Sequence, residues 1–170
     1  MGEVVRWRLS HRFGCGLPLA NRHYNRQKPE SPQFVPPGRC VVMVAGEGPK
    51  AVWVSSWPKY ARHAWCGAWV NTLFRNEGAG LSSELIIEAE RVTRWKWGNP
   101  PEPHGFITFV DAEKVKGKRD PGYCYLMAGW KLVGKTQSGL LTFQRLPIEA
   151  PEAAPPLGEE TMFASQKGGV

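Results

Sequence analysis

A glycine-rich loop between two patterned segments is the first place where this sequence could do chemistry. Residues 75–80 read Arg-Asn-Glu-Gly-Ala-Gly. The run before them, Ala68 to Phe74, is short, aromatic and β-branched, which is typical of a buried strand. The run from Leu81 onward repeats its apolar residues with a helical period. A strand followed by a loop and a helix N-terminus leaves main-chain N–H groups unpaired at the positive end of the helix dipole, which predicts a site for a phosphate or pyrophosphate.

The side chains around this loop add to the expected anion site. Gly78 and Gly80 would let the backbone approach a ligand closely, and Arg75 could place a cation beside it. Ser82 and Ser83 open the helix, where one hydroxyl would satisfy a free N–H group and the other could reach a phosphate. The alternative is a tight turn whose glycines serve geometry alone. The candidate cofactor-binding residues are Arg75, Asn76, Glu77, Gly78, Ala79, Gly80, Ser82 and Ser83.

Two local patterns resemble one enzyme family. The spacing Arg-x-x-Gly-x-Gly between a strand and a helix resembles the pyrophosphate loop of the GNAT superfamily, the acyl-CoA-dependent N-acyltransferases. It is not the dinucleotide fingerprint, which needs three glycines and a following acidic residue. Many GNAT members also carry a tyrosine four residues before a Gly-Phe pair, and Tyr125 precedes Gly129-Trp130 by that interval.

The resemblance implies a fold and a reaction. The fold is α/β (α+β), with a mixed, mostly antiparallel central sheet, flanking helices and an acyl-CoA cleft between two splayed parallel strands, residues 68–74 and 106–111. The reaction is acyl transfer from acetyl-CoA or another acyl-CoA to an amine. Tyr125 would be the catalytic acid that protonates the leaving thiolate, because a phenol is a donor at neutral pH. Tyr125 could instead be a core aromatic on a short helix. Tyr123 is the substitute acid if that helix is offset. The general base is left open among Glu77, Asp111, His23, His63 and His104.

Hydrophobic patterning predicts the elements that must position these residues. We expect a single acyltransferase-like domain over residues 1–146 and an acidic, proline-rich, disordered tail over residues 147–170. Strands are predicted at 3–9, 40–45, 51–56, 68–74, 106–110, 131–133 and 140–146, with 40–45 and 51–56 forming an antiparallel hairpin. Helices are predicted within 11–28, from 81 to about 97, and at 121–128.

Composition limits the class of protein. A chain of 170 residues can form one domain with a full core. No apolar run reaches membrane-spanning length, and the N-terminal segment carries arginines where a signal peptide needs an apolar stretch, so we expect no membrane association and a cytoplasmic location, in a bacterium or a phage-infected host. The four cysteines form no Cys-x-x-Cys pair, so no metal site or redox motif is predicted.

Charge and a short N-terminal patch bear on the acceptor. The net charge is +7, and residues 1–40 hold seven Lys/Arg against two Glu, which favours a polyanionic partner such as DNA. The candidate substrate-binding residues are Arg22, His23, Tyr24 and Arg26, because a tyrosine can stack on a base while arginines contact phosphates. His-Tyr followed by a polar residue and Arg resembles a patch in the bacteriophage Mom proteins, GNAT-like enzymes that modify the exocyclic amine of adenine in phage DNA and shield it from restriction. The acceptor could instead be a small-molecule or protein amine, or the chain could bind nucleic acid without catalysis.

Overall fold

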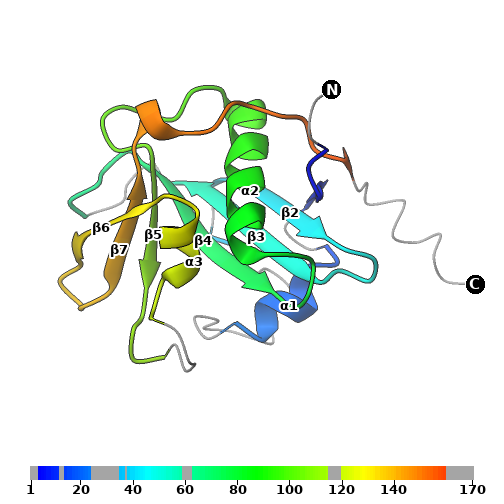
Figure 1. The fold of residues 1–170 in the computed structure, drawn as a ribbon, viewed down its shortest axis with the longest axis horizontal. Coiled ribbons are helices and arrows are strands. Elements are labelled where there is room, and N and C mark those ends of the chain that lie inside the picture. The colour runs from blue at the N-terminus through cyan, green and yellow to red at the C-terminus, as the bar shows by residue number, and fades with distance from the viewer. Residues whose placement is uncertain are drawn as a thin grey trace, which may run out of the picture.

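The chain folds as a mixed α/β structure built on one large sheet (Figure 1). The computed structural model describes residues 4–11, 14–23, 35–36, 38–58, 63–114 and 120–159. Within these residues the strands and helices are β1 (Trp7–Ser10), α1 (Leu17–Asn21), β2 (Arg39–Ala45), β3 (Ala51–Trp57), β4 (Trp69–Asn76), α2 (Ser82–Trp97), β5 (Phe106–Val110), α3 (Tyr123–Met127), β6 (Lys131–Lys135), β7 (Leu141–Arg145), the 3-10 helix η1 (Pro147–Glu149) and β8 (Gly158–Glu159). In this part of the chain, no helix is both long and apolar enough to cross a membrane.

The sheet is open and mostly antiparallel. Its eight described strands follow the order β6-β7-β5-β4-β3-β2-β1-β8. Strands β2 and β3 pair as the predicted antiparallel hairpin, from Arg39 opposite Trp57 to Ala45 opposite Ala51. Strand β5 lies inside the sheet between β4 and β7, as its apolar sequence predicted. Two neighbouring pairs are parallel, β4 with β5 and β1 with β8.

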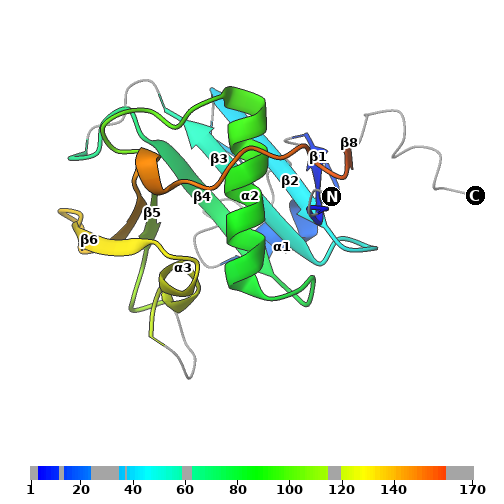
Figure 2. The same cartoon turned by 45° about the horizontal axis from the view of Figure 1, so that its top comes forward.

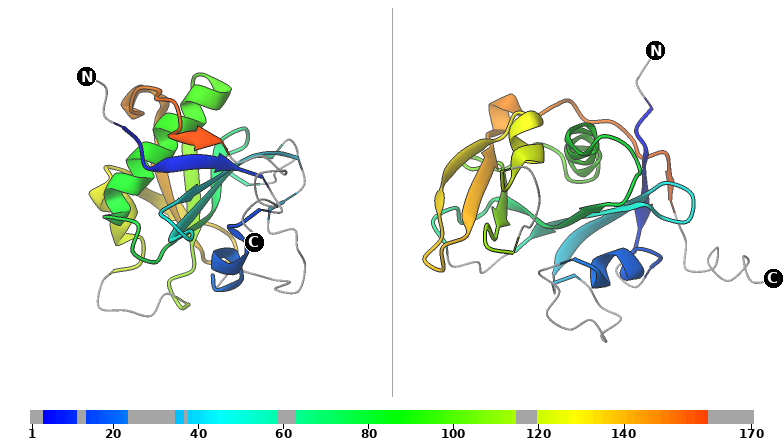
Figure 3. Two further views of the ribbon diagram at one scale, coloured as in Figure 1. Left: turned by 90° about the vertical axis from the view of Figure 1, so that its right-hand side faces the viewer. Right: turned by 60° about the horizontal axis from the view of Figure 1, so that its bottom comes forward.

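Helices cover both faces of the sheet (Figure 3). Side chains alternate between the two faces of a strand, and here both faces carry apolar side chains that a helix can bury. Helix α2 places an apolar stripe against one face, where Trp7, Met43 and Trp53 are fully buried. Helix α1 buries Leu19 and Ala20 against the valines that β2 and β3 turn to the other face. At about 25 cal/mol per Å² of buried apolar surface, these two layers supply the main stabilisation of the fold.

A buried ion pair joins α2 to β7 next to the C-terminal end of α3. Arg145 Nε and Nη2 donate to the two carboxylate oxygens of Glu90 at 2.7 and 3.2 Å, and Nη2 also donates to the carbonyl of Ala128. Glu90 is 1% exposed and Arg145 8%. Burial raises the pKa of Glu90 to about 7, although the Arg145 hydrogen bond and charge oppose the rise. The pair therefore fixes the helix that carries Tyr125.

The segment after β7 is ordered, which corrects the prediction of a disordered tail from residue 147. Figure 2 shows this segment crossing α2 to reach β1. The main-chain N–H of Ala154 donates to Arg91 O, the N–H of Leu157 donates to Trp7 O, and β8 pairs parallel to β1. The domain thus extends to at least Glu159, and residues 160–170 lie outside the described part.

Arginines on α2 explain why this proline-rich segment is held. Prolines cannot donate main-chain hydrogen bonds, so the segment depends on partners for its carbonyl groups. Arg94 donates to the carbonyls of Ala150 and Pro151 at 3.4 and 3.0 Å, and Arg91 donates to that of Glu152 at 3.1 Å. Composition alone predicted disorder because these partners are supplied by a helix more than fifty positions earlier.

Candidate functional site

A pocket opens where the parallel strands β4 and β5 part. Their ladder has three positions, of which the last joins Asn71 to Thr108, while β4 runs on to Asn76. A pocket of about 160 Å³ lies at this point, lined by the adjoining parts of β4 and β5, by α3 and by His23. Tyr125 reaches it from the α2 face and His23 from the end of α1 on the other face. Side chains from both faces of the sheet therefore line the pocket.

A β-bulge in β4 accompanies this separation. Against β3, Leu73 lies opposite Val54 but Asn71 lies opposite Ser55, so Thr72 is the extra residue of the bulge. A bulge bends the strand that contains it and increases its twist. The bend falls at the position where pairing with β5 stops, and it directs the second half of β4 away from β5.

Tyr125 both lines this pocket and belongs to the core. The residue is 7% exposed, and its ring packs against Trp130, Phe143 and Phe74 at centroid distances of 5.1, 6.0 and 6.4 Å. The hydroxyl donates a hydrogen bond to Asn71 Oδ1. Tyr125 can therefore be a core aromatic and still offer its hydroxyl to the candidate site. The neighbouring Cys124 also lines the pocket, and burial raises the pKa of its thiol.

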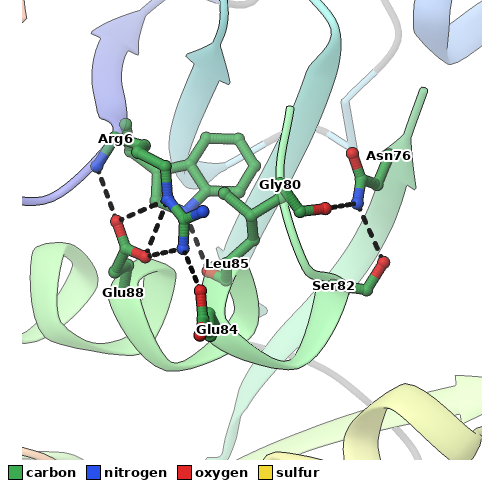
Figure 4. A network of polar contacts seen from close by, with 8 residues as sticks. Arg6, Asn76, Gly80, Ser82, Glu84, Leu85 and Glu88 are labelled. Carbon is green, nitrogen blue, oxygen red and sulfur yellow. Dashed lines mark hydrogen bonds and ion pairs between the residues drawn. The ribbon is translucent and has the colours of Figure 1, made fainter. Parts of the chain in front are cut away.

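The glycine loop after β4 is organised by the side chain of Asn76 (Figure 4). Asn76 Oδ1 accepts from the N–H groups of Gly78 and Ala79 at 3.1 and 2.9 Å, and Nδ2 donates to Gly80 O at 2.7 Å and to Ser82 Oγ at 2.9 Å. Gly78 and Gly80 both have positive φ, at 103° and 146°, a backbone conformation that favours glycine. Asn76, expected to contact a cofactor, thus supports the loop from within.

The two serines do not cap α2 as predicted. Leu81 occupies the N-cap position and no side-chain cap hydrogen bond is present there. The hydroxyl of Ser82 is directed to Asn76 instead, and Ser83 follows at the second helical position. The first-turn N–H groups of α2 are therefore left without a side-chain cap, which keeps them suited to an anion.

Arg6 on the approach to β1 covers Gly80, a contact that sequence reasoning missed (Figure 4). A Cβ atom at Gly80 would lie 2.2 Å from Arg6 Nη1. The guanidinium is held there by Glu88, at 2.5 Å from Nη2, and by Glu84, at 3.0 Å, and the Glu88 hydrogen bond raises the pKa of Arg6. A side chain at Gly80 would displace this guanidinium, so the glycine accommodates a contact between distant parts of the chain, which no local pattern could reveal.

Arg75 does not extend over the loop as a free cation. Its Nε donates to Glu77 Oε2 at 2.5 Å and its Nη1 to the carbonyl of Arg22 at 2.8 Å. Arg22 in turn donates to both oxygens of Glu77 at 2.9 and 3.0 Å. Hydrogen bonds from Arg22 and then Arg75 lower the pKa of Glu77 to about 2, so Glu77 is a weak base at neutral pH. The structure brings Arg22 to the loop, whereas Tyr24 and Arg26 lie outside the described residues.

Two of the remaining candidate bases, His23 and His63, lie in different surroundings. His23 lines the pocket, one residue beyond the Arg22 that binds the loop. His63 lies behind Phe109, with ring centroids 5.4 Å apart, and its Nδ1 accepts from the N–H of Trp65. Burial, followed by the charge of His104, lowers the pKa of His63. Among the described residues, His23 is the candidate base that contacts the pocket.

An anionic group fits the loop through main-chain contacts. Nothing lies within 4 Å of a Cβ built on Gly78, so the loop has open space on that side, next to the uncapped start of α2. The nearby cations Arg6, Arg22 and Arg75 are all paired with carboxylates. A bound phosphate would therefore depend chiefly on N–H groups and the helix dipole. Within the described part of the chain, no cluster of three His, Cys, Asp or Glu could hold a metal ion.

Comparisons with known proteins return no match. No protein-family model, curated protein or solved structure matches this chain. The function must therefore be inferred from the geometry of the pocket and the loop.

Proposed function

We propose that the chain is an acyl-CoA-dependent N-acyltransferase of the GNAT type. The observation that carries the proposal is the pocket between parallel strands β4 and β5, with the Tyr125 hydroxyl on its wall and the glycine loop at the end of the same strand. From Asn71 to Asn76 a strand spans about 16 Å, at roughly 3.3 Å per residue. An extended thioester-bearing arm could therefore lie along β4, with its phosphates at the loop and its sulfur near Tyr125.

The residues at the pocket fit the proton movements of acyl transfer. A bound acyl-CoA would supply an activated thioester carbonyl, which an amine attacks as the carbon–sulfur bond breaks. Tyr125 would donate its hydroxyl proton to the departing sulfur and recover a proton from solvent. His23 lines the same pocket and could accept the proton that the amine loses and then release it to solvent. The products are an amide and a free thiol, so protons balance over the cycle.

The first candidate acceptor is an amine on a nucleic-acid base, in a Mom-like modification that protects DNA from restriction. The net charge of +7 supports a polyanionic partner. His23 lines the pocket, and its neighbour Arg22 contacts Glu77 of the glycine loop, so a cation lies near the proposed acceptor site. A base would have to leave its stack to reach the thioester, as in other enzymes that act on base amines.

The second candidate acceptor is a small-molecule or protein amine. The supporting observation is that Arg22 is engaged by Glu77 through two hydrogen bonds, so a DNA phosphate would have to displace that carboxylate. A small amine needs no such displacement.

Native mass spectrometry with and without acetyl-CoA tests the cofactor. We expect one retained or added CoA mass on the wild-type chain. Gly78→Ala places a methyl group in the open space of the loop and should weaken binding at least tenfold. Gly139→Ala is the matched control, because Gly139 also has positive φ and open surroundings but lies in the β6–β7 turn. Binding that survives Gly78→Ala, or is lost equally in Gly139→Ala, contradicts the loop assignment.

The acceptor is then identified with labelled acetyl-CoA and a set of amines. Label transferred to adenine-containing oligonucleotides but not to polyamines or peptides supports the first candidate, and the reverse supports the second. Retention on DNA without binding of any acyl-CoA would indicate a nucleic-acid-binding protein and would overturn the enzyme proposal.

A further inference from the structure

Asn71 is a buried polar residue among the apolar side chains of the first half of β4. Its residue exposure is 4%, and its neighbours Trp69, Val70 and Leu73 are also buried. Asparagine is depleted in strands, and burying an amide without partners costs about 1–3 kcal/mol. An apolar residue would suit the strand better, so the hydrogen bonds of this side chain need an explanation.

The orientation of the Asn71 amide is fixed by two carbonyl groups. Nδ2 donates to Val54 O at 3.1 Å and to Leu73 O at 2.8 Å. These oxygens are acceptors only, so they exclude the flipped amide, which would set its own oxygen against them. Both amide protons are thus used within the bulge, and Oδ1 is directed toward Tyr125.

The direction of the Tyr125 hydrogen bond follows from this orientation. Since Oδ1 can only accept, the phenol must be the donor. Thr108 has a single hydroxyl proton to donate. Its Oγ1 lies 3.0 Å from the main-chain oxygen of Asn71 and 3.4 Å from Asn71 Oδ1, so its principal partner is the main chain. Oδ1 is therefore chiefly the acceptor for Tyr125.

We propose that Asn71 is the positioning residue of this pocket, an amide fixed by the β4 bulge that holds the Tyr125 hydroxyl in one orientation until a leaving thiolate takes its proton. The inference rests on the proposed function. A hydrogen bond to a charged acceptor is roughly twice as strong as one to a neutral oxygen. As negative charge develops on sulfur, the thiolate outcompetes the amide. The hydroxyl then turns about its Cζ–Oη bond and transfers the proton, which solvent replaces.

The first test needs no activity. In ¹H NMR of the free wild-type protein, a buried donating hydroxyl should give a slowly exchanging signal that contacts the Asn71 side-chain amide protons in NOE spectra. Tyr125→Phe assigns the signal, and Asn71→Ala should remove it. Thr108→Val is the matched control and should keep it, because it leaves both partners in place. A wild-type Tyr125 hydroxyl without an NOE to Asn71 overturns the inference, even if Asn71→Ala does not fold.

The second test separates positioning from a merely structural role. We expect Asn71→Ala to lower kcat about 10- to 100-fold, part of the 10²- to 10⁴-fold that acid–base catalysis supplies, with KM for acetyl-CoA unchanged. In the Tyr125→Phe background the same substitution should change kcat little, because the two residues act as a unit. An equal fall in both backgrounds contradicts the inference. If the wild-type chain acylates no amine, the proposed function fails, while the NMR result still decides whether Asn71 positions Tyr125.

Discussion

Removing Arg145 should destabilise the fold strongly, because it leaves the Glu90 carboxylate buried without a partner. Arg145→Met deletes two hydrogen bonds to Glu90 and one to the carbonyl of Ala128. Breaking a buried pair by removing one partner costs about 3–5 kcal/mol. That is a large part of the roughly 5–15 kcal/mol by which a domain is stable. With a urea m-value of about 2 kcal/mol/M, the unfolding midpoint should fall by about 2 M.

The pH dependence of this loss follows from the pKa of Glu90. Burial raises that pKa to about 7, above its ordinary value of 4.5, so the native state holds the proton more strongly than the unfolded chain. The stability contributed by this group is fully present below pH 4.5 and is lost as the pH rises through 7. Arg145 opposes the rise, so its removal should cost less near pH 5, where the Ala128 carbonyl still loses its donor, than near pH 8.

Urea unfolding followed by tryptophan fluorescence at pH 5 and pH 8 measures both effects. Lys131→Met is the control, because its pair with Glu149 is exposed and should contribute about 0–1 kcal/mol. Combining Arg145→Met with Glu90→Leu should recover most of the loss, since no charge is then buried alone. A cost for Arg145→Met as small as that of Lys131→Met, or equal at both pH values, would refute the reasoning.

Two further predictions concern other parts of the described structure. A chain that ends at Leu146 should melt at a lower temperature than one that ends at Glu159, because it loses the hydrogen bonds to α2 and β1. Equal melting temperatures in calorimetry would show that the segment contributes nothing to stability. In ¹³C NMR the Glu77 carboxyl should titrate near pH 2 in the wild-type protein and closer to pH 4.5 in Arg22→Gln. Its interactions with the arginines are fully present above pH 4.5 and are lost as the pH falls through 2. A wild-type midpoint near 4.5 would mean that the cluster does not form in solution.

Much of the fold could be predicted because its elements are marked locally. The hairpin of β2 and β3, the helix before Gly98 and the strand β5 all follow from apolar period and turn residues. The segment after β7 was mispredicted because proline-rich composition favours disorder unless other parts of the chain supply partners. Arg91 and Arg94 supply them, and nothing in the local sequence of the segment reveals this.

The site was predictable only in part, for the same reason. The glycine loop and Tyr125 could be located from spacing, but the contacts that control them come from distant residues. Arg6 reaches Gly80 from just before β1, and Arg22 reaches Glu77 from just after α1. Asn71 did carry a local signal, since it stands beside the apolar Trp69, Val70 and Leu73, and a buried polar side chain must find hydrogen-bond partners. Its partner Tyr125 lies 54 positions away and became identifiable only in three dimensions.

The pairing of β8 with β1 affects how this protein folds during its synthesis. Arg8 lies opposite Gly158, 150 positions later in the chain. At about 5–20 residues per second, a ribosome makes the second strand roughly 8 to 30 seconds after the first. Throughout that interval β1 can pair with β2, but its other edge is open to neighbouring chains. Strand β8 therefore covers the edge of β1 only late in synthesis. Nascent chains that stall before β8 is made should aggregate more readily than full-length chains.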